Sequence, residues 1–425
     1  MTYETRPTES LTLSAGAGKD GAGPAVPGGG APRVDVVRTT VVVSLAHALV
    51  DAYAGFVPPL LPRIMDKLGL SIALAATVAM TFSLATAVLQ PILGWLSDRG
   101  CRRAFVIGGP LLSAVFLSLI GLAPTYSVLL AFLILAGLGH AAFHPPGAAL
   151  AARVEAGAGS GARVSAFAFA GAAGYAVGPV SVVWLVAHRG LEGMWVAMLP
   201  ALFLTPVALL ALPRLPASRP GRLDRGALSE LLAHIAGPLA VVFAISTVAA
   251  FIQRVYLTLA PIIVAQGGGS EARGAFAVSV YLAAQALGTV LGGFLTDRMD
   301  RRTLLVTLSL AAIPAHALAF ALHPGSGAGL AAAAAAGFLN MAMVPPVVVM
   351  AQEMLPARAA LGSGIVLGLA WAAASVAVIA VGAVADYTGP LSAALLSVPL
   401  LLGATALALH PSLAPHARGS TGSPT

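Results

Sequence analysis

The chain has 425 residues, of which 58% are hydrophobic and only 9% are charged. Because soluble globular proteins carry about 25% charged residues, this composition excludes an ordinary water-soluble enzyme. The 23 basic residues outnumber the 16 acidic ones, but they lie mainly in short loops between apolar runs, which argues against a nucleic-acid-binding face.

In chain order, residues 1–32 are rich in Ser, Gly, Ala and Pro and are expected to form a disordered cytoplasmic tail. Twelve apolar runs follow, each about as long as a membrane span. The charged segment 213–232 predicts a cytoplasmic linker between two six-helix halves, 33–212 and 233–411, and residues 412–425 predict a second cytoplasmic tail. The predicted helices occupy residues 36–62, 72–97, 104–123, 126–150, 163–187, 192–212, 233–264, 273–296, 303–322, 327–352, 360–384 and 389–410.

Short motifs recur between the two halves at a nearly constant spacing. The run GWLSDR at 94–99 returns as GFLTDR at 293–298, an offset of 199 residues, and Gly137 matches Gly337 at an offset of 200. Six is an even number of spans, so both halves run in the same direction through the bilayer. This repeat predicts an all-α fold with a binding cavity at mid-depth between the halves.

The basic residues predict the orientation in the membrane. With the N-terminus inside, 18 of the 23 Lys and Arg residues fall on the cytoplasmic side, as the positive-inside rule requires. Both termini are therefore expected in the cytoplasm.

The single cysteine, Cys101, excludes an intramolecular disulfide and a multi-cysteine metal site.

The repeated loop motif resembles the G-x-x-x-D-R-x-G-R-R signature of the major facilitator superfamily, although Asp300 stands at the second glycine of the later copy. The resemblance implies twelve helices in two pseudo-symmetric halves. It also implies that the two loops act as a charge latch during alternating access. The gating residues carried over from the family are Gly94, Asp98, Arg99, Arg103, Gly293, Asp297 and Arg298.

Three further motifs are similar to the fosmidomycin-resistance branch of that superfamily. They are HALVD at 47–51 followed by PLLP at 59–62, AFHPPG at 142–147, and QEMLP at 352–356. This resemblance implies proton-driven efflux of a small, anionic antibiotic or metabolite across a bacterial cytoplasmic (inner) membrane.

An ionisable side chain deep in a span marks a candidate functional site. Asp51 lies near the middle of the first predicted span, and His47 lies one turn earlier on the same helical face. A carboxylate beside a histidine can exchange and relay a proton, whereas the alternative is a polar contact that locks two helices together. Asp51 and His47 are the first candidates for proton coupling, and Glu353 at the end of the tenth span is a candidate gate or second protonation site, or a partner in an interfacial ion pair.

Arg254 in the seventh span is the candidate anion-binding residue, because a guanidinium facing a cavity suits a phosphonate, phosphate or carboxylate. Alternatively its side chain extends to the outer headgroups. The other candidate substrate-binding residues are His140, His144, Gln253, Tyr256 and Gln352.

His140 and His144 lie four residues apart, a spacing that can bind a metal, yet no acidic residue lies in their span, so no metal site is expected. The two other interpretations are that His140 and His144 border the transport path, or that they join helices by hydrogen bonds. In the fifth span, Gly171, Gly174 and Gly178 predict close helix packing.

No phosphate-binding G-x-x-x-x-G-K-[ST] motif occurs, so an ion gradient and not ATP is expected to supply the energy. The sequence predicts a non-enzymatic secondary transporter that acts as a monomer in the lipid bilayer, with a small-molecule substrate and protons as partners and no cofactor. Two alternatives remain open. One is an importer of an organic anion on the same fold, and the other is a membrane sensor that binds a ligand without moving it.

Overall fold

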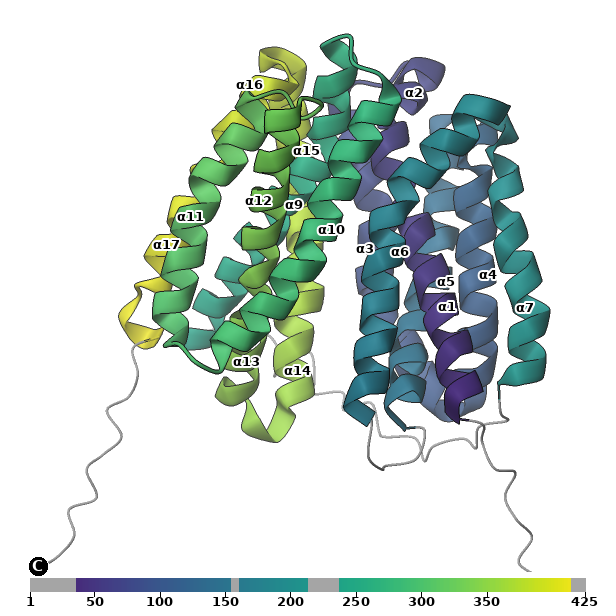
Figure 1. Cartoon of the computed structure of the whole chain (residues 1–425), viewed down its shortest axis with the longest axis horizontal. Helices are drawn as coiled ribbons and strands as arrows, with labels where there is room; N and C mark the ends of the chain where they lie inside the picture. Colours follow the sequence, from purple (N-terminus) through teal and green to yellow (C-terminus); the bar gives the residue numbers. More distant parts are fainter. Residues whose placement is uncertain (1–35, 154–159, 213–236, 414–425) are drawn as a thin grey trace, which may run out of the picture. The chain divides into compact units, whose positions relative to one another are not determined.

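The computed structural model describes residues 36–153, 160–212 and 237–413. Helices form almost all of these ranges (Figure 1). No strand occurs within these ranges. The predicted tail 1–32, the predicted linker 213–232 and all but two residues of the predicted tail 412–425 lie outside them. The first half contains α1 (Val36–Ala54), α2 (Val57–Leu68), α3 (Ile72–Leu96), α4 (Arg102–Leu119), α5 (Tyr126–Arg153), α6 (Ser160–Arg189) and α7 (Leu199–Ala211). The second contains α9 (Pro238–Gln266), α10 (Glu271–Thr296), α11 (Arg301–Ala321), α12 (Gly327–Ala342), α13 (Val344–Met354), α14 (Ala359–Ser363), α15 (Ala370–Thr388), α16 (Pro390–Ser397) and α17 (Leu400–Ala408).

Eleven helical stretches within the described ranges are long and apolar enough to cross a bilayer. One of them, Ile72–Leu122, has 51 residues, which at 1.5 Å per residue would extend about 76 Å, far more than a bilayer is thick. It contains two predicted spans, joined by a π-helical turn at Ser97–Cys101. Gly100 in this turn has φ 116°, a conformation that residues with a side chain rarely adopt. The all-α fold with twelve spans is therefore confirmed.

Prolines divide several spans into two helices. Pro58 and Pro59 stand in the first turn of α2, where missing N–H groups cost nothing, so the first span breaks between α1 and α2. Pro345 and Pro346 divide the tenth span in the same way between α12 and α13. The equivalent pair in the first half, Pro145 and Pro146, lies inside α5, which continues through it.

Equivalent residues of the two halves cap equivalent helices and permit equivalent helix contacts. Ser71 caps α3 by accepting a hydrogen bond from the Leu74 backbone N–H, and Ser270 caps α10 in the same way. Gly137 lets α5 approach α3, since a Cβ there would lie 2.8 Å from the Ala85 Cβ. Its counterpart Gly337 lets α12 approach α10. The sequence repeat therefore reflects a repeated packing pattern.

The two halves touch along α3 with α15, α6 with α10, and α2 with α9 and α10. At the ends predicted to face outward, Arg63 of α2 forms an ion pair with Glu271, the first residue of α10. The Asp386 carboxylate of α15 accepts hydrogen bonds from the backbone N–H groups of Ile72 (2.7 Å) and Ala73 (3.2 Å) in the first turn of α3. Polar contacts therefore join the halves at this end.

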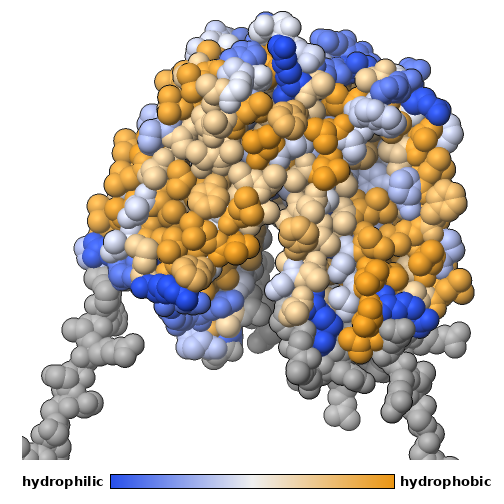
Figure 2. Space-filling model, in the orientation of Figure 1, coloured by the Kyte–Doolittle hydropathy of each residue, from blue (hydrophilic) through white to orange (hydrophobic). Residues whose placement is uncertain are grey.

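Large apolar side chains lie on the surface of the helices, while hydrophilic residues gather near the helix ends (Figure 2). Leu210 and Phe203 of α7 are 86% and 74% exposed, and Val290 of α10 is 73% exposed. A water-soluble protein would not present such a surface, but lipid tails would cover it favourably.

Candidate functional site in a cavity between the two halves

A cavity of about 440 Å³ is lined by side chains from both halves. This volume is within the range of sites for drug-sized molecules. The first half contributes residues of α1, α2, α3, α5 and α6, and the second half contributes residues of α9, α10, α12, α15 and the turn that precedes α15. Six of the candidates from the sequence line it, namely His47, Asp51, His140, His144, Gln253 and Arg254.

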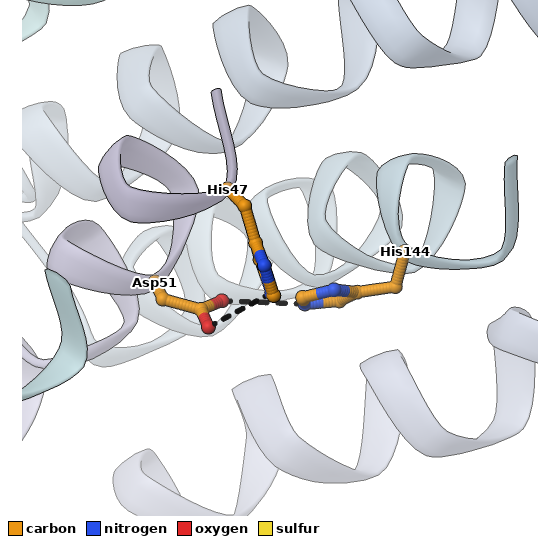
Figure 3. A group of neighbouring side chains, drawn as sticks. All are labelled: His47, Asp51 and His144. Carbon is orange, nitrogen blue, oxygen red and sulfur yellow. Dashed lines mark ion pairs between the residues drawn. The ribbon is translucent and has the colours of Figure 1, made fainter. Parts of the chain in front are cut away.

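Asp51 lies at the centre of a histidine cluster on the first-half side of the cavity. Its Oδ2 is 3.2 Å from His47 Nε2, and its Oδ1 is 3.3 Å from His144 Nε2 and 3.9 Å from His140 Nε2. The side chains of His47 and Asp51 extend from α1 toward that of His144 on α5 (Figure 3). The two histidines of α5 also contact each other through Nε2 atoms 2.7 Å apart.

The hydrogen bond on the far side of the His47 ring determines what the cluster can do. His47 Nδ1 lies 2.7 Å from the Phe167 carbonyl oxygen, which can only accept, so Nδ1 carries a hydrogen. A neutral His47 would then present a lone pair at Nε2 to the Asp51 carboxylate. One proton between His47 and Asp51 removes this repulsion, whether it resides on the imidazole or on the carboxyl group. This geometry can accommodate one proton shared between His47 and Asp51.

Glycines of α6 allow this cluster to form. A Cβ on Gly171 would lie 2.4 Å from His47 Cε1 and 2.7 Å from Asp51 Oδ2. A Cβ on Gly174 would lie only 1.9 Å from the Ala48 carbonyl oxygen. Because such distances are sterically impossible, the glycines predicted from the sequence to permit close packing are what bring α6 against α1 and enclose Asp51.

The same cluster has the composition of a metal site. The ligand atoms of His47, Asp51 and His144 all lie within 4.8 Å of one another, so these three residues could hold a metal ion. Sequence reasoning set this aside because the span of His140 and His144 has no acidic residue. That reason was incomplete, since Asp51 reaches the histidines from α1.

Arg254 lies on the second-half side of the cavity. Its Nη1 donates a hydrogen bond to Ser83 Oγ of α3 at 2.7 Å, and its guanidinium carbon lies 5.7 Å from the centre of the Trp371 ring. Its Nε is buried and has no hydrogen-bond partner among the described residues. No carboxylate of the described residues lies within 4.0 Å of the guanidinium. Within this part of the chain, the positive charge therefore faces the cavity without an acidic partner.

Gln253 begins a chain of buried amides next to Arg254. Its Nε2 donates to Gln285 Oε1 (2.9 Å), and Gln285 in turn donates to Asn340, whose Nδ2 donates to the Ala249 carbonyl oxygen (2.9 Å). This network fixes the orientation of the Gln253 and Gln285 side chains at the cavity wall.

Three other sequence candidates do not line this cavity. Tyr256 is fully buried in the second half, with its ring stacked on Tyr281. Gln352 donates a hydrogen bond to Ser363 Oγ at 2.8 Å. Glu353 forms an ion pair with Arg301 at the end of α13 and lines a separate polar cavity.

In the first loop motif, charged side chains contact their neighbours in the same half. Asp98 accepts a hydrogen bond from Arg102 at 2.6 Å, and Arg99 lies over the Trp95 ring. Arg103 donates to the Leu209 and Leu212 carbonyl oxygens at the end of α7. A Cβ on Gly94 would lie 3.4 Å from the Pro145 Cβ, an ordinary van der Waals contact.

The second copy of the motif is arranged differently. Arg298 lies over the Phe294 ring, Asp297 lines the polar cavity beside Glu353, and nothing among the described residues crowds Gly293. Asp300, at the position of the missing glycine, caps α11 by accepting a hydrogen bond from the Thr303 backbone N–H. Arg302, the equivalent of Arg103, donates to carbonyl oxygens at the end of α17.

Sequence reasoning missed Ser83, Gln285 and Trp371, which line the cavity. Gln285 and Ser83 are polar residues within apolar runs, a signal that could have marked them. Trp371 gave no such signal, because aromatic residues are common in membrane helices.

Comparisons with known proteins agree with this architecture. The family model for the Major Facilitator Superfamily matches residues 43–360 and 239–424. The chain is 27% identical over 392 residues to the uncharacterized MFS-type transporter YfnC of Bacillus subtilis (strain 168), covering 87% of this chain and 92% of the relative. It is 26% identical over 357 residues to the fosmidomycin resistance protein of Escherichia coli (strain K12), covering 81% and 86%.

Solved structures show the same fold at low identity. A bacterial homolog of the human lysosomal transporter Spinster, inward-facing and unoccupied, matches with a TM-score of 0.69 and 17% identity over 89% of this chain and 97% of its own. A mutant of the nucleoside transporter NupG matches with a TM-score of 0.73 and 13% identity over 87% and 98%. The predicted resemblance is confirmed, and the chain belongs to the major facilitator superfamily of multi-pass membrane transporters.

Proposed function

We propose that this transporter is a proton-coupled exporter of a small organic anion similar to fosmidomycin. The observation that carries the proposal is the Arg254 guanidinium at the cavity wall, which has no acidic partner among the described residues and lies opposite the Asp51 cluster. A buried charge without a counter-charge is costly, so an anionic substrate that enters the cavity gains a strong, charge-assisted interaction with it. Gln253, His140 and His144 line the same cavity and supply further hydrogen-bonding groups to the substrate.

In this proposal Asp51 and His47 exchange the coupling proton. The geometry that accommodates one proton between them supports this role, because losing that proton leaves two groups that repel each other. In this proposal such a change alters how α1 packs against α5 and α6, three of the helices that line the cavity from the first half. Glu353 lies outside the cavity. It therefore acts as a gate or second protonation site of its own, at the cytoplasmic ends of the helices.

The two halves rock against each other to open the cavity on alternate sides. The loop residues Gly94, Asp98, Arg99, Arg103, Gly293, Asp297 and Arg298 belong to the cytoplasmic gate of this cycle. The protein works as a monomer in a bacterial inner membrane with both termini in the cytoplasm, the orientation that the basic residues favour. The name of the Escherichia coli relative supports export of an antibiotic anion.

The test uses inside-out membrane vesicles from an efflux-deficient bacterium, with the lumen acidified by respiration and radiolabelled fosmidomycin outside. An exporter that exchanges protons for the anion accumulates the label, and an uncoupler releases it. Arg254→Ala should lose more than nine-tenths of the accumulation, whereas Arg189→Ala, at an exposed position, should keep it.

Two results would overturn the proposal. Loss of preloaded label driven by the same gradient would identify an importer. Saturable binding of fosmidomycin with no flux in either direction would identify a sensor.

A further inference from the structure

Trp371 carries a buried polar atom that the fold leaves unused. Its indole Nε1 has no hydrogen-bond partner among the described residues, although a buried N–H normally finds one. Only two other residues that line the cavity have such an atom within the described ranges, Arg254 at Nε and His140 at Nδ1. Two of the three unused groups, those of Trp371 and Arg254, are therefore donors on the second-half side.

These two donors are neighbours on adjacent helices. Arg254 lies on α9 and Trp371 at the start of α15, helices that pack against each other. The guanidinium carbon is 5.7 Å from the centre of the indole ring, within the range of a cation–π contact. The aromatic ring thus holds the guanidinium in place without using its Nε–H group or its own N–H group.

The backbone before Trp371 is also specialised. A π-helical turn at Gly364–Leu369 immediately precedes α15, and Leu367 and Gly368 of this turn line the cavity. A π-turn adds a residue to the helical repeat and so changes the direction of the side chains that follow, and such turns occur frequently at functional sites. The π-turn therefore affects the direction in which the Trp371 side chain leaves α15, and Trp371 lines the cavity.

We propose that Trp371 and Arg254 together bind one oxyanion group of the substrate, with indole Nε1–H and guanidinium Nε–H donating to its oxygens. This inference rests on the proposed function and deepens it by naming a residue that determines specificity. Much of the remaining wall is apolar, including Phe82, Leu257, Leu282 and Val378. The substrate class is therefore an organic anion with one carboxylate, phosphonate or sulfonate head, whose remaining atoms contact this apolar wall and the hydrogen-bonding groups of Gln253, His140 and His144.

The first test measures binding to the full-length protein in detergent by equilibrium dialysis. The probes are labelled benzoate, phenylphosphonate and benzenesulfonate, with neutral benzamide as the uncharged comparison. Trp371→Phe keeps an aromatic ring but removes the N–H donor, so the affinity for at least one of the three anions should fall tenfold or more while benzamide binding stays the same. The matched control is Trp184→Phe, because Trp184 is 65% exposed on α6 and should leave binding unchanged.

A second measurement separates substrate contact from a structural role. The chain has four tryptophans, so replacing Trp95, Trp184 and Trp195 by Phe leaves Trp371 as the only tryptophan fluorophore. Its emission should change with anion concentration and saturate at the dissociation constant found by dialysis. A matching chain that retains only Trp184 should show no change.

Each alternative outcome is decisive. Anion affinities of Trp371→Phe within twofold of the wild type, or a silent Trp371 emission while dialysis shows binding, would overturn the role of Trp371 and leave the proposed function intact. Absence of saturable binding of all three anions, in a protein that still transports fosmidomycin, would overturn the substrate class. Unchanged anion binding by Arg254→Ala would instead show that Arg254 does not bind the anion, and would overturn the anion site on which the proposed function depends.

Discussion

Arg254 on α9 donates a hydrogen bond from Nη1 to Ser83 Oγ on α3, 2.7 Å away, and so links the two halves across the cavity. A hydroxyl is the group from the opposite half that this charge contacts. An anion that takes over this donor must therefore break a bond between the halves. In the proposed mechanism, substrate binding is therefore coupled at this point to the relative position of the halves.

Ser83→Ala should strengthen anion binding several-fold. Without Ser83 Oγ, Arg254 Nη1 loses its partner in the empty protein, which raises the free energy of the empty state by about 1.5–3 kcal/mol at most. Equilibrium dialysis with labelled fosmidomycin measures the change, and Ser181→Ala, outside the cavity, is the control. Weaker binding would mean that Ser83 itself contacts the substrate.

Gly174→Ala should destabilise the fold. Its Cβ would lie 1.9 Å from the Ala48 carbonyl oxygen, so α6 must move away from α1, at a cost of about 1–3 kcal/mol or more. The melting temperature in detergent should fall. Transport that depends on the cluster of Asp51 and the histidines should fall as well. Gly108→Ala is the matched control, because nothing among the described residues lies within 4 Å of a Cβ there. Equal melting temperatures for the two variants would contradict the close packing of α6 against α1.

Asp386→Asn should favour the state that is open to the outside. The carboxylate of Asp386 compensates the first N–H groups of α3 from the other half, so the amide weakens a contact that closes the outer end. In a Cys101→Ser background, a cysteine at Ala172 in the cavity should react faster with an impermeant thiol reagent added outside. Tyr387→Phe, at a position 92% exposed, provides the control. An unchanged or slower reaction would rule out a closing role for Asp386.

Removal of metal ions should leave transport unchanged. One proton between His47 and Asp51 is enough to remove the repulsion between them. The cluster therefore does not need a metal ion for stability. Vesicles treated with a membrane-permeant chelator such as 1,10-phenanthroline should still accumulate fosmidomycin. If the activity disappears and Zn²⁺ but not Mg²⁺ restores it, the cluster of His47, Asp51 and His144 is a metal site instead.

The sequence predicts the fold more completely than the site, for identifiable reasons. Apolar runs and the repeated motifs define the twelve spans, because both reflect local constraints. The pairing of His47 with Asp51 follows from a spacing of four residues on one helix. The approach of His144 depends on tertiary packing, which a single sequence does not record.

Helix geometry also explains where the prediction fell short. Successive residues are turned by about 100°, so Tyr256, two positions after Arg254, points away from the cavity and into the second half. Ser83 and Trp371 are brought to Arg254 from other helices. Gln352 and Glu353 stand at the end of α13, where depth along the helix, not residue type, separates them from the cavity.

The most direct test of proton-coupled export compares wild-type and Asp51→Asn protein in inside-out vesicles with an acidified lumen, at equal protein amounts. Asp51→Asn should lose at least tenfold in gradient-driven accumulation of fosmidomycin yet retain exchange of labelled for unlabelled fosmidomycin, since Arg254 is intact. Asp66→Asn, an exposed carboxylate on α2, should behave like the wild type. Accumulation by Asp51→Asn at the wild-type level, still abolished by an uncoupler, would contradict proton coupling through Asp51.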